Sequence, residues 1–193
     1  DPVNVTKRNL QLNSSTASFK VEADSLRQFV AFNGSSYLSP DLIGSVSNQN
    51  LHGLPQADML IVCHPDFWSE AERLAEFHRT SETNSLSVHI VSPAQIFNEF
   101  SSGAQDVSSI RDFMRMFYER STNPNDLPRY LLLFGDASYD YKDRLPGNTN
   151  FVPTYESVES LTPTISYASD DYFGLLDPDE GAWASSASDA LDI

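Results

Sequence analysis

An unbroken apolar run from Tyr130 to Phe134, followed by Gly135 and Asp136, is the strongest hydrophobic pattern in the chain. The run is too short for a helix, so it predicts a central strand that is buried on both faces. Gly135 allows the backbone to turn sharply, which places Asp136 at the carboxyl end of this strand. Ligands and reacting groups gather at that end of open α/β sheets. We therefore expect any chemistry of this chain to lie near Asp136.

Apolar segments with strand and helix periodicity alternate before this run. Met59–Cys63 and Leu86–Val91 are predicted strands. The predicted helices are residues 67–79 with Asp66 as a cap, a short helix from Ser92-Pro93, and a third helix capped by Asp106 or Ser108 with the apolar stripe Ile110, Phe113, Met114 and Phe117. Strands that alternate with helices pair in parallel. Residues 57–193 are therefore predicted to form an α/β domain of three layers, α/β/α, with a mostly parallel sheet.

Residues 1–56 show a different pattern. Apolar and charged residues alternate from Phe19 to Asp24, which is typical of a half-buried strand, and a second strand is predicted over 28–32. A polar turn lies around Asn13–Thr16. Two or three strands are too few for a stable sheet. We interpret residues 1–56 as the tail of an upstream β-rich domain, ending in a polar linker over 45–55.

The periodicity fades after Asp136. Residues 137–168 contain several prolines and are predicted to be a long loop, which in a compact domain usually serves a function. In the motif Ser169–Gly174 we expect Asp170 to cap the turn that Gly174 closes. The last residues, 190–193, have the pattern of a strand that is cut off. The chain is therefore predicted to be a fragment of a longer protein.

Charge and apolar length exclude several kinds of partner. The chain has 27 acidic and 12 basic residues and a net charge of −15, so phosphates of nucleic acid and anionic membrane surfaces would repel it. No apolar run approaches the ~20 residues that a bilayer-spanning helix needs. The one cysteine, Cys63, cannot form an internal disulfide, so cysteine usage does not indicate a compartment.

Nucleophile and cofactor motifs are scarce. Cys63 and His64 are neighbours, but consecutive strand residues point to opposite faces, so we expect Cys63 to be core filling and not part of a thiol–imidazole dyad. The remaining histidines, His52, His78 and His89, lack the spacing of a metal site. No Gly-x-Ser-x-Gly elbow or glycine-rich phosphate loop is present, which disfavours a serine hydrolase and a flavodoxin-like cofactor binder. These residues alone do not make a catalytic apparatus.

Acidic residues at strand ends and in loops suggest a metal site. Clustered carboxylate oxygens are the ligands that Ca²⁺ prefers. Asp136 and Asp192 are the best candidates, because they would meet at one edge if they end or begin neighbouring parallel strands. The run Asp177–Gly181 does not have the spacing of a known calcium loop. The alternative is a solvated acidic surface, as any chain of this charge would show.

Several ordered segments resemble the gingipain-type cysteine peptidase family. They are Asn48–Gly53, Ala57–Val62, Ala71–Arg79, Ile96–Gly103, Ile110–Phe113 and Tyr130–Asp140. The resemblance implies a caspase-like fold, in which two side-by-side α/β/α subdomains follow a β-rich region. This chain then corresponds to the end of that region and the first, non-catalytic subdomain.

The resemblance also implies an activity for the whole protein. Like the sortases of this family, it would remove C-terminal sorting domains from cargo of the type IX secretion system and join the cargo to anionic lipopolysaccharide through a thiolate and an acyl-enzyme. It would act at the bacterial cell surface, associated with the outer membrane and with attachment-complex proteins such as PorV.

The resemblance assigns no catalytic residue to this chain, since the family's catalytic histidine and cysteine lie beyond Ile193. Asp136 and Asp192 resemble the family's ligands for a structural Ca²⁺. A second hypothesis is that the chain is a non-catalytic binding module of a surface attachment complex.

Overall fold

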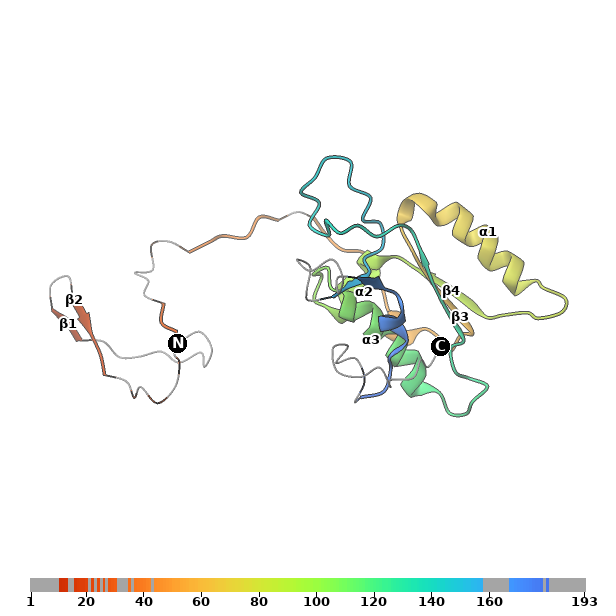
Figure 1. The fold of residues 1–193 in the computed structure, drawn as a ribbon, viewed down its shortest axis with the longest axis horizontal. Helices are drawn as coiled ribbons and strands as arrows, with labels where there is room; N and C mark the ends of the chain where they lie inside the picture. Colours follow the sequence, from red (N-terminus) through yellow and green to blue (C-terminus); the bar gives the residue numbers. More distant parts are fainter. Residues whose placement is uncertain are drawn as a thin grey trace. The chain divides into compact units, whose positions relative to one another are not determined.

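The computed structural model describes residues 11–13, 16–20, 22, 24, 26, 28–30, 35, 37–42, 44–157, 167–178 and 180. The chain divides into two compact units, Asp1–Val46 and Ser47–Ile193. In the first unit, β1 (Gln11–Asn13) pairs antiparallel with β2 (Thr16–Ser18) (Figure 1). The middle of the predicted polar turn, residues 14–15, lies outside the described residues. The described residues of 19–24 and 28–32 are not in strands, contrary to expectation.

The second unit is built on a parallel sheet of three strands in the order β4–β3–β5. These are β3 (Met59–Cys63), β4 (Val88–Val91) and β5 (Tyr130–Phe134). Met59 of β3 lies opposite Val88 on one side and Tyr130 on the other, and both pairs of strands run parallel. The structure therefore confirms the predicted strands and their parallel pairing.

The central strand is β3 and not β5, which corrects the expectation for the run from Tyr130. All five residues of β3 are buried, whereas Tyr130 is 46% exposed and the other residues of β5 are half-buried. Within the described residues, β5 has a neighbouring strand on one side only. An apolar run records that helices cover both faces of a strand, but it does not reveal how many strands flank it.

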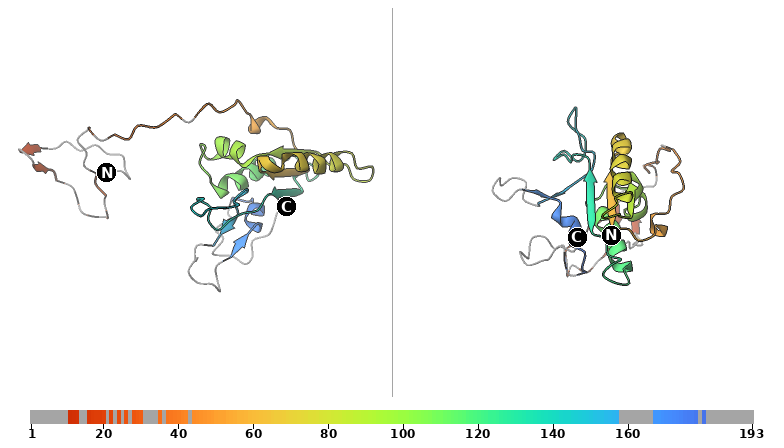
Figure 2. Two further views of the ribbon diagram at one scale, coloured as in Figure 1. Left: turned by 90° about the horizontal axis from the view of Figure 1, so that it is seen from above. Right: turned by 90° about the vertical axis from the view of Figure 1, so that its right-hand side faces the viewer.

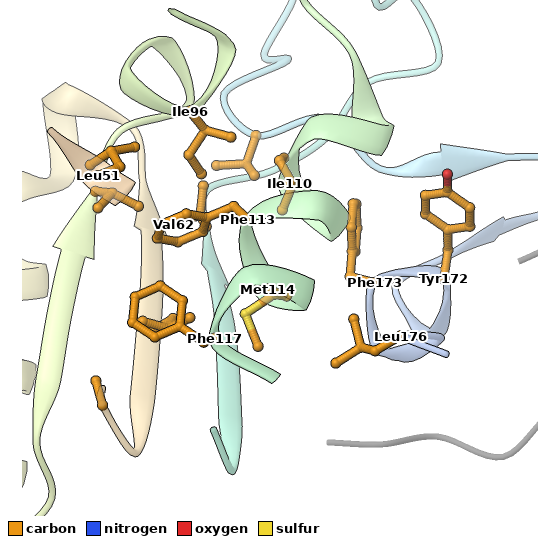
Figure 3. Packing of buried hydrophobic residues seen from close by; sticks show 14 residues of the cluster. Leu51, Val62, Ile96, Ile110, Phe113, Met114, Phe117, Tyr172, Phe173 and Leu176 are labelled. Carbon is orange, nitrogen blue, oxygen red and sulfur yellow. The ribbon is translucent and has the colours of Figure 1, made fainter. Parts of the chain in front are cut away.

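Helices cover both faces of this sheet, as Figures 1 and 2 show. On one face lies α1 (Trp68–Arg79), where Ala71 and Ala75 pack against Met59, Ile61 and Cys63 of β3. On the other face lie α2 (Pro93–Phe100) and α3 (Val107–Arg120), which pack against Leu60 and Val62 of β3 (Figure 3). The predicted stripe of α3 is fully buried. Side chains of β3 alternate between the two cores, so the unit is a three-layer α/β/α structure, consistent with a caspase-like fold.

Helix starts follow the sequence signals in two of three cases. Ser92 caps α2 in a capping box with Gln95, and Asp106 caps α3 by accepting from the Ser108 N–H. The prediction that Asp66 caps α1 is wrong, because the N-cap residue of this helix is Phe67. Pro65 starts a short 3₁₀ turn, η2 (Pro65–Phe67), so His64 occupies the capping position and its Nδ1 accepts from the Asp66 N–H.

The segment 47–56, expected to be a linker, packs on the second unit. Leu51, in the 3₁₀ turn η1 (Leu51–Gly53), is 4% exposed and belongs to the core between the sheet and α3. Its backbone N–H donates to Glu99 Oε1 of α2 at 2.7 Å. The division into two compact units falls between Val46 and Ser47, and the polar residues of 49–52 find hydrogen-bond partners on α2.

The region after β5 is not entirely loop. The short strand β6 (Tyr155–Glu156) pairs antiparallel with β7 (Ala168–Ser169), and the 3₁₀ helix η3 (Asp171–Gly174) packs on α3. Phe173 and Leu176 fill the core there (Figure 3). Across the part of the chain that the structure describes, no helix has the length and apolar character needed to cross a membrane.

Candidate functional site at the carboxyl edge of the sheet

The carboxyl end of β5 is closed by tight contacts with the segment that returns after residue 150. Gly135 has φ +152°, and a Cβ at this position would lie 2.8 Å from Phe151 Cβ. The next residue, Asp136, accepts through its backbone carbonyl from the N–H groups of Phe151 and Val152, at 2.8 and 3.2 Å. A glycine is therefore required here, and the chain between residues 136 and 151 forms a loop whose two ends meet.

The loop over residues 137–150 extends beyond the tip of the β5 arrow (Figure 2) and is braced from within. Asp140 Oδ2 accepts from the backbone N–H groups of Arg144 and Leu145, at 2.5 and 2.6 Å. The Asn148 side chain donates to the Asp140 carbonyl at 2.7 Å, and Gln105, outside the loop, donates to the Tyr141 carbonyl at 3.0 Å. Hydrogen bonds thus give the loop a defined backbone conformation.

A hollow of about 700 Å³ lies between this loop, the start of α3 and the strand β6. Its lining carries both signs of charge together with aromatic and polar side chains. The lining residues are Gln105, Asp106, Val107, Ser138, Tyr139, Asp140, Tyr141, Lys142, Arg144, Leu145, Asn150, Pro153, Thr154, Glu156 and Ser157. A hollow of this size at the carboxyl edge of an α/β sheet is the expected position for a binding site.

The acidic groups of the hollow differ in how they are compensated. Asp106 and Asp140 accept from backbone N–H groups, and Asp106 also lies at the positive end of α3. The side-chain carboxyl of Glu156 makes no hydrogen bond within the described residues, and burial raises its pKa. Glu156 is therefore the acid here whose charge is least stabilised by the protein.

Cys63 and His64 do not form a thiol–imidazole dyad. Cys63 is fully buried in the core beneath α1, and its thiol donates to the His64 carbonyl at 3.1 Å. Burial, with a smaller contribution from the charge of Glu70, raises the pKa of this thiol and so disfavours the thiolate. The His64 ring packs against Phe151, with ring centroids 4.8 Å apart. The prediction that Cys63 fills the core is confirmed.

The proposed calcium ligands stay a prediction. Asp136 is exposed at the end of β5, as the sequence predicts, but Asp192 lies outside the described residues. Among the described residues, no group of three or more histidine, cysteine, aspartate and glutamate side chains is placed to hold a metal ion. Asp170 does not cap its turn through its side chain, which instead accepts from the Thr154 hydroxyl at 2.9 Å.

Sequence reasoning missed two features of the second unit. Glu99 binds the segment 49–52, and its partners lie about 50 residues away in the chain, so no local pattern reveals them. The hollow was also missed: residues 137–168 were expected to be a long loop that usually serves a function, but the sequence did not show that part of this loop borders a hollow. Its one available signal was the spacing of Tyr139 and Tyr141 around Asp140, an acid that frequently organises turns.

The fold and the site define the class of the unit: a three-layer α/β/α domain with a parallel sheet and a hollow at the strand ends. The sequence model of Peptidase family C25 matches residues 52–193, and the chain belongs to this family, the gingipain family. The chain is similar to the dimeric latent PorU from Porphyromonas gingivalis, with 39% identity and a TM-score of 0.62. That match covers 72% of this chain and 14% of the PorU chain. No curated protein sequence matched the chain.

Proposed function

We propose that this chain is the first, non-catalytic α/β/α subdomain of a cysteine endopeptidase with sortase activity. The observation that carries the proposal is the family match over residues 52–193 on a caspase-like fold. The single cysteine of the chain is buried under α1, and its raised pKa disfavours a nucleophilic thiolate. In agreement with the family resemblance, the catalytic cysteine and histidine of the whole protein would be supplied by residues beyond Ile193.

The reaction of the whole protein would proceed in two acyl-transfer steps. A thiolate attacks the carbonyl carbon at the junction with the C-terminal sorting domain, a thioester forms, and the C–N bond breaks as a general acid gives a proton to the leaving amine. In the second step an amine on anionic lipopolysaccharide, or water, attacks the thioester and releases the thiol. In this scheme the α/β/α unit of this chain supports the catalytic half and helps to shape its cleft.

Location, partners and metal follow from the same proposal. The protein would act at the bacterial cell surface, associated with the outer membrane, on secreted cargo and beside attachment-complex proteins such as PorV. A structural Ca²⁺ would bind at Asp136 and Asp192. What supports the metal is the position of Asp136 at the carboxyl end of β5, where this residue is exposed, because carboxylate oxygens are ligands that Ca²⁺ prefers.

A binding module without catalysis is the second candidate. The observation that favours it is the hollow of about 700 Å³, which exists without a thiol–imidazole pair among the described residues. Under this alternative, the carboxyl edge of the sheet recruits proteins of a surface attachment complex.

The two candidates are separated by a form of the protein extended beyond Ile193. We expect this form to cleave cargo that carries a sorting domain, and a thiol-reactive probe to abolish the cleavage by labelling a downstream cysteine. The matched control is Cys63→Ala in the same extended form, which should keep both the cleavage and the labelling. Mass spectrometry of the product distinguishes transfer to an amine from hydrolysis. An extended protein that binds cargo but neither cleaves it nor reacts with the probe would support the binding module.

The metal is tested separately from catalysis. Calorimetric titration of the extended protein with CaCl₂ should show binding that is lost in Asp136→Asn. A melting temperature that is unchanged after chelation would contradict a structural Ca²⁺, because a ligand that binds the folded state must stabilise it.

A further inference from the structure

Three large apolar side chains are exposed on the loop that borders the hollow. Tyr139, Tyr141 and Leu145 are 67%, 52% and 66% exposed, and all three line the hollow. Single exposed apolar residues are common on protein surfaces, but three within seven residues beside a concave surface are typical of an interaction site.

The backbone that carries these side chains is already ordered. Asp140 and Asn148 brace the loop from within, and Gln105 ties it to the segment that precedes α3. A partner would therefore not have to order this backbone, which removes one of the main entropic costs of binding. Tyrosine adds a large contact area with few rotatable bonds, so it loses little side-chain entropy on binding.

The loop also presents two cations, Lys142 and Arg144, for which the described residues supply no carboxylate partner. Arg79 and Arg129 form ion pairs with Glu72 and Asp58. Lys142 and Arg144, in contrast, have no ion pair within the described part of the chain, although the protein carries 27 acidic residues. Lys142 lies near the ring of its neighbour Tyr141, at 5.2 Å from the ring centroid.

Three acids line the hollow, Asp106, Asp140 and Glu156, and none of them forms an ion pair with Lys142 or Arg144 within the described residues. Glu156 lies on β6, outside the loop, and its carboxylate makes no hydrogen bond with any described residue. Asp140 accepts from the backbone N–H groups of Arg144 and Leu145. Asp106 accepts from the first turn of α3. Backbone N–H groups therefore already occupy Asp106 and Asp140, and among the described residues Lys142 and Arg144 remain available to bind an anion from outside.

We propose that the hollow and the loop residues around it form a docking surface for a polypeptide segment in which an acidic side chain adjoins an apolar one. The residues that recognise it are Tyr139, Tyr141, Lys142, Arg144 and Leu145. The apolar side chain enters the hollow against the tyrosines and Leu145, while the carboxylate binds Arg144 and Lys142. Tyrosine and arginine are the residue types that contribute most often to binding hot spots. This docking surface does not depend on the proposed peptidase activity, and it adds a binding function to that activity.

Selection from a random peptide library displayed on phage, with the complete 193-residue chain as the target, tests this surface. We expect the selected peptides to share an aspartate or glutamate next to an aliphatic or aromatic residue. A fluorescein-labelled peptide from the selection should bind Tyr141→Ala and Arg144→Glu at least about tenfold more weakly, as expected for hot-spot residues. Matched controls are Phe77→Ala and Arg73→Glu on α1, where Phe77 is 67% exposed; both should bind the peptide as the parent chain does.

Two results would overturn the proposal. The first is a failed selection: no peptide binds, or the selected peptides show no preference for aspartate or glutamate, or they bind Tyr141→Ala and Arg144→Glu as tightly as they bind the parent chain. The other concerns the protein extended beyond Ile193: if Lys142 reacts with an amine-specific acetylating reagent in the 193-residue chain but is protected in the extended form, the loop is covered by the same polypeptide. Equal reactivity of Lys142 in both forms, together with the acidic consensus, supports a separate partner.

Discussion

The carboxylate of Glu99 holds the segment 49–52 against α2, and its removal should destabilise the second unit. Its Oε1 accepts from the Gln49 side chain and the Leu51 N–H, at 2.9 and 2.7 Å. Its Oε2 accepts from the His52 N–H and from His52 Nδ1, at 3.2 and 2.7 Å. Glu99→Gln keeps the shape but removes the charge, and it turns an NH₂ group toward these donors.

The expected loss follows from the pKa of Glu99. Burial by itself raises this pKa, but the hydrogen bonds from Leu51, Gln49 and His52 outweigh it and lower the pKa from 4.5 to about 2. At about 1.4 kcal/mol for each unit of pKa, this difference corresponds to about 3 kcal/mol. Because 15% of the side chain is exposed, we reduce the expected loss to about 2 kcal/mol. For a unit of this size, that lowers the melting temperature by about 4–8 °C.

The effect has a defined dependence on pH. A carboxyl whose pKa is lower in the folded state stabilises the protein fully above its unfolded pKa, and this contribution is lost as the pH falls toward the folded value. The free energy of unfolding should therefore differ between the parent and Glu99→Gln by the full amount at pH 7, and the difference should shrink between pH 4.5 and about 2.

Urea unfolding followed by far-ultraviolet circular dichroism measures this difference at each pH. The control is Glu72→Gln on α1, which removes an ion pair with Arg79 between side chains that are 48% and 35% exposed, and we expect it to cost less than about 0.5 kcal/mol. The reasoning is refuted if Glu99→Gln costs no more than Glu72→Gln at pH 7, or if its cost is the same at pH 7 and pH 2.

Three further predictions concern backbone and core. Gly135→Ala should destabilise the unit by about 2–3 kcal/mol, because φ is +152° and the new Cβ would meet Phe151. The control Gly147→Ala, at φ +76° in open space, should cost about 1 kcal/mol, and thermal unfolding compares the two variants. Phe117→Ala should cost about 3–5 kcal/mol in urea unfolding, since its ring is fully buried, and a cost below 1 kcal/mol would contradict the assigned core. Cys63 should react with a thiol reagent only in denaturant, and rapid labelling of the native chain would show that the thiol is accessible.

The hydrophobic pattern located most of the second unit but not its spatial order. The strands at Met59–Cys63 and Tyr130–Phe134 and the buried stripe of α3 were predictable, because burial against a helix layer or a sheet imposes a period on the side chains. The central position of β3 was not, because strand order depends on how the crossover connections place each strand. The same limit applies to Asp66: Pro65 began a 3₁₀ turn that His64 caps, and α1 starts after Phe67 without a side-chain cap.

The sequence by itself therefore determined the class of fold, the parallel pairing, the family resemblance and the burial of Cys63. All of these depend on local patterns or on short ordered motifs. Only the tertiary structure decided that residues 47–53 belong to the α/β unit, since Glu99 binds them across about 50 residues of chain. It also decided that the loop after Asp136 borders a hollow whose lining includes Tyr139, Tyr141, Lys142 and Arg144. Contacts between distant segments arise only when the whole chain has packed, so no window of sequence contains them.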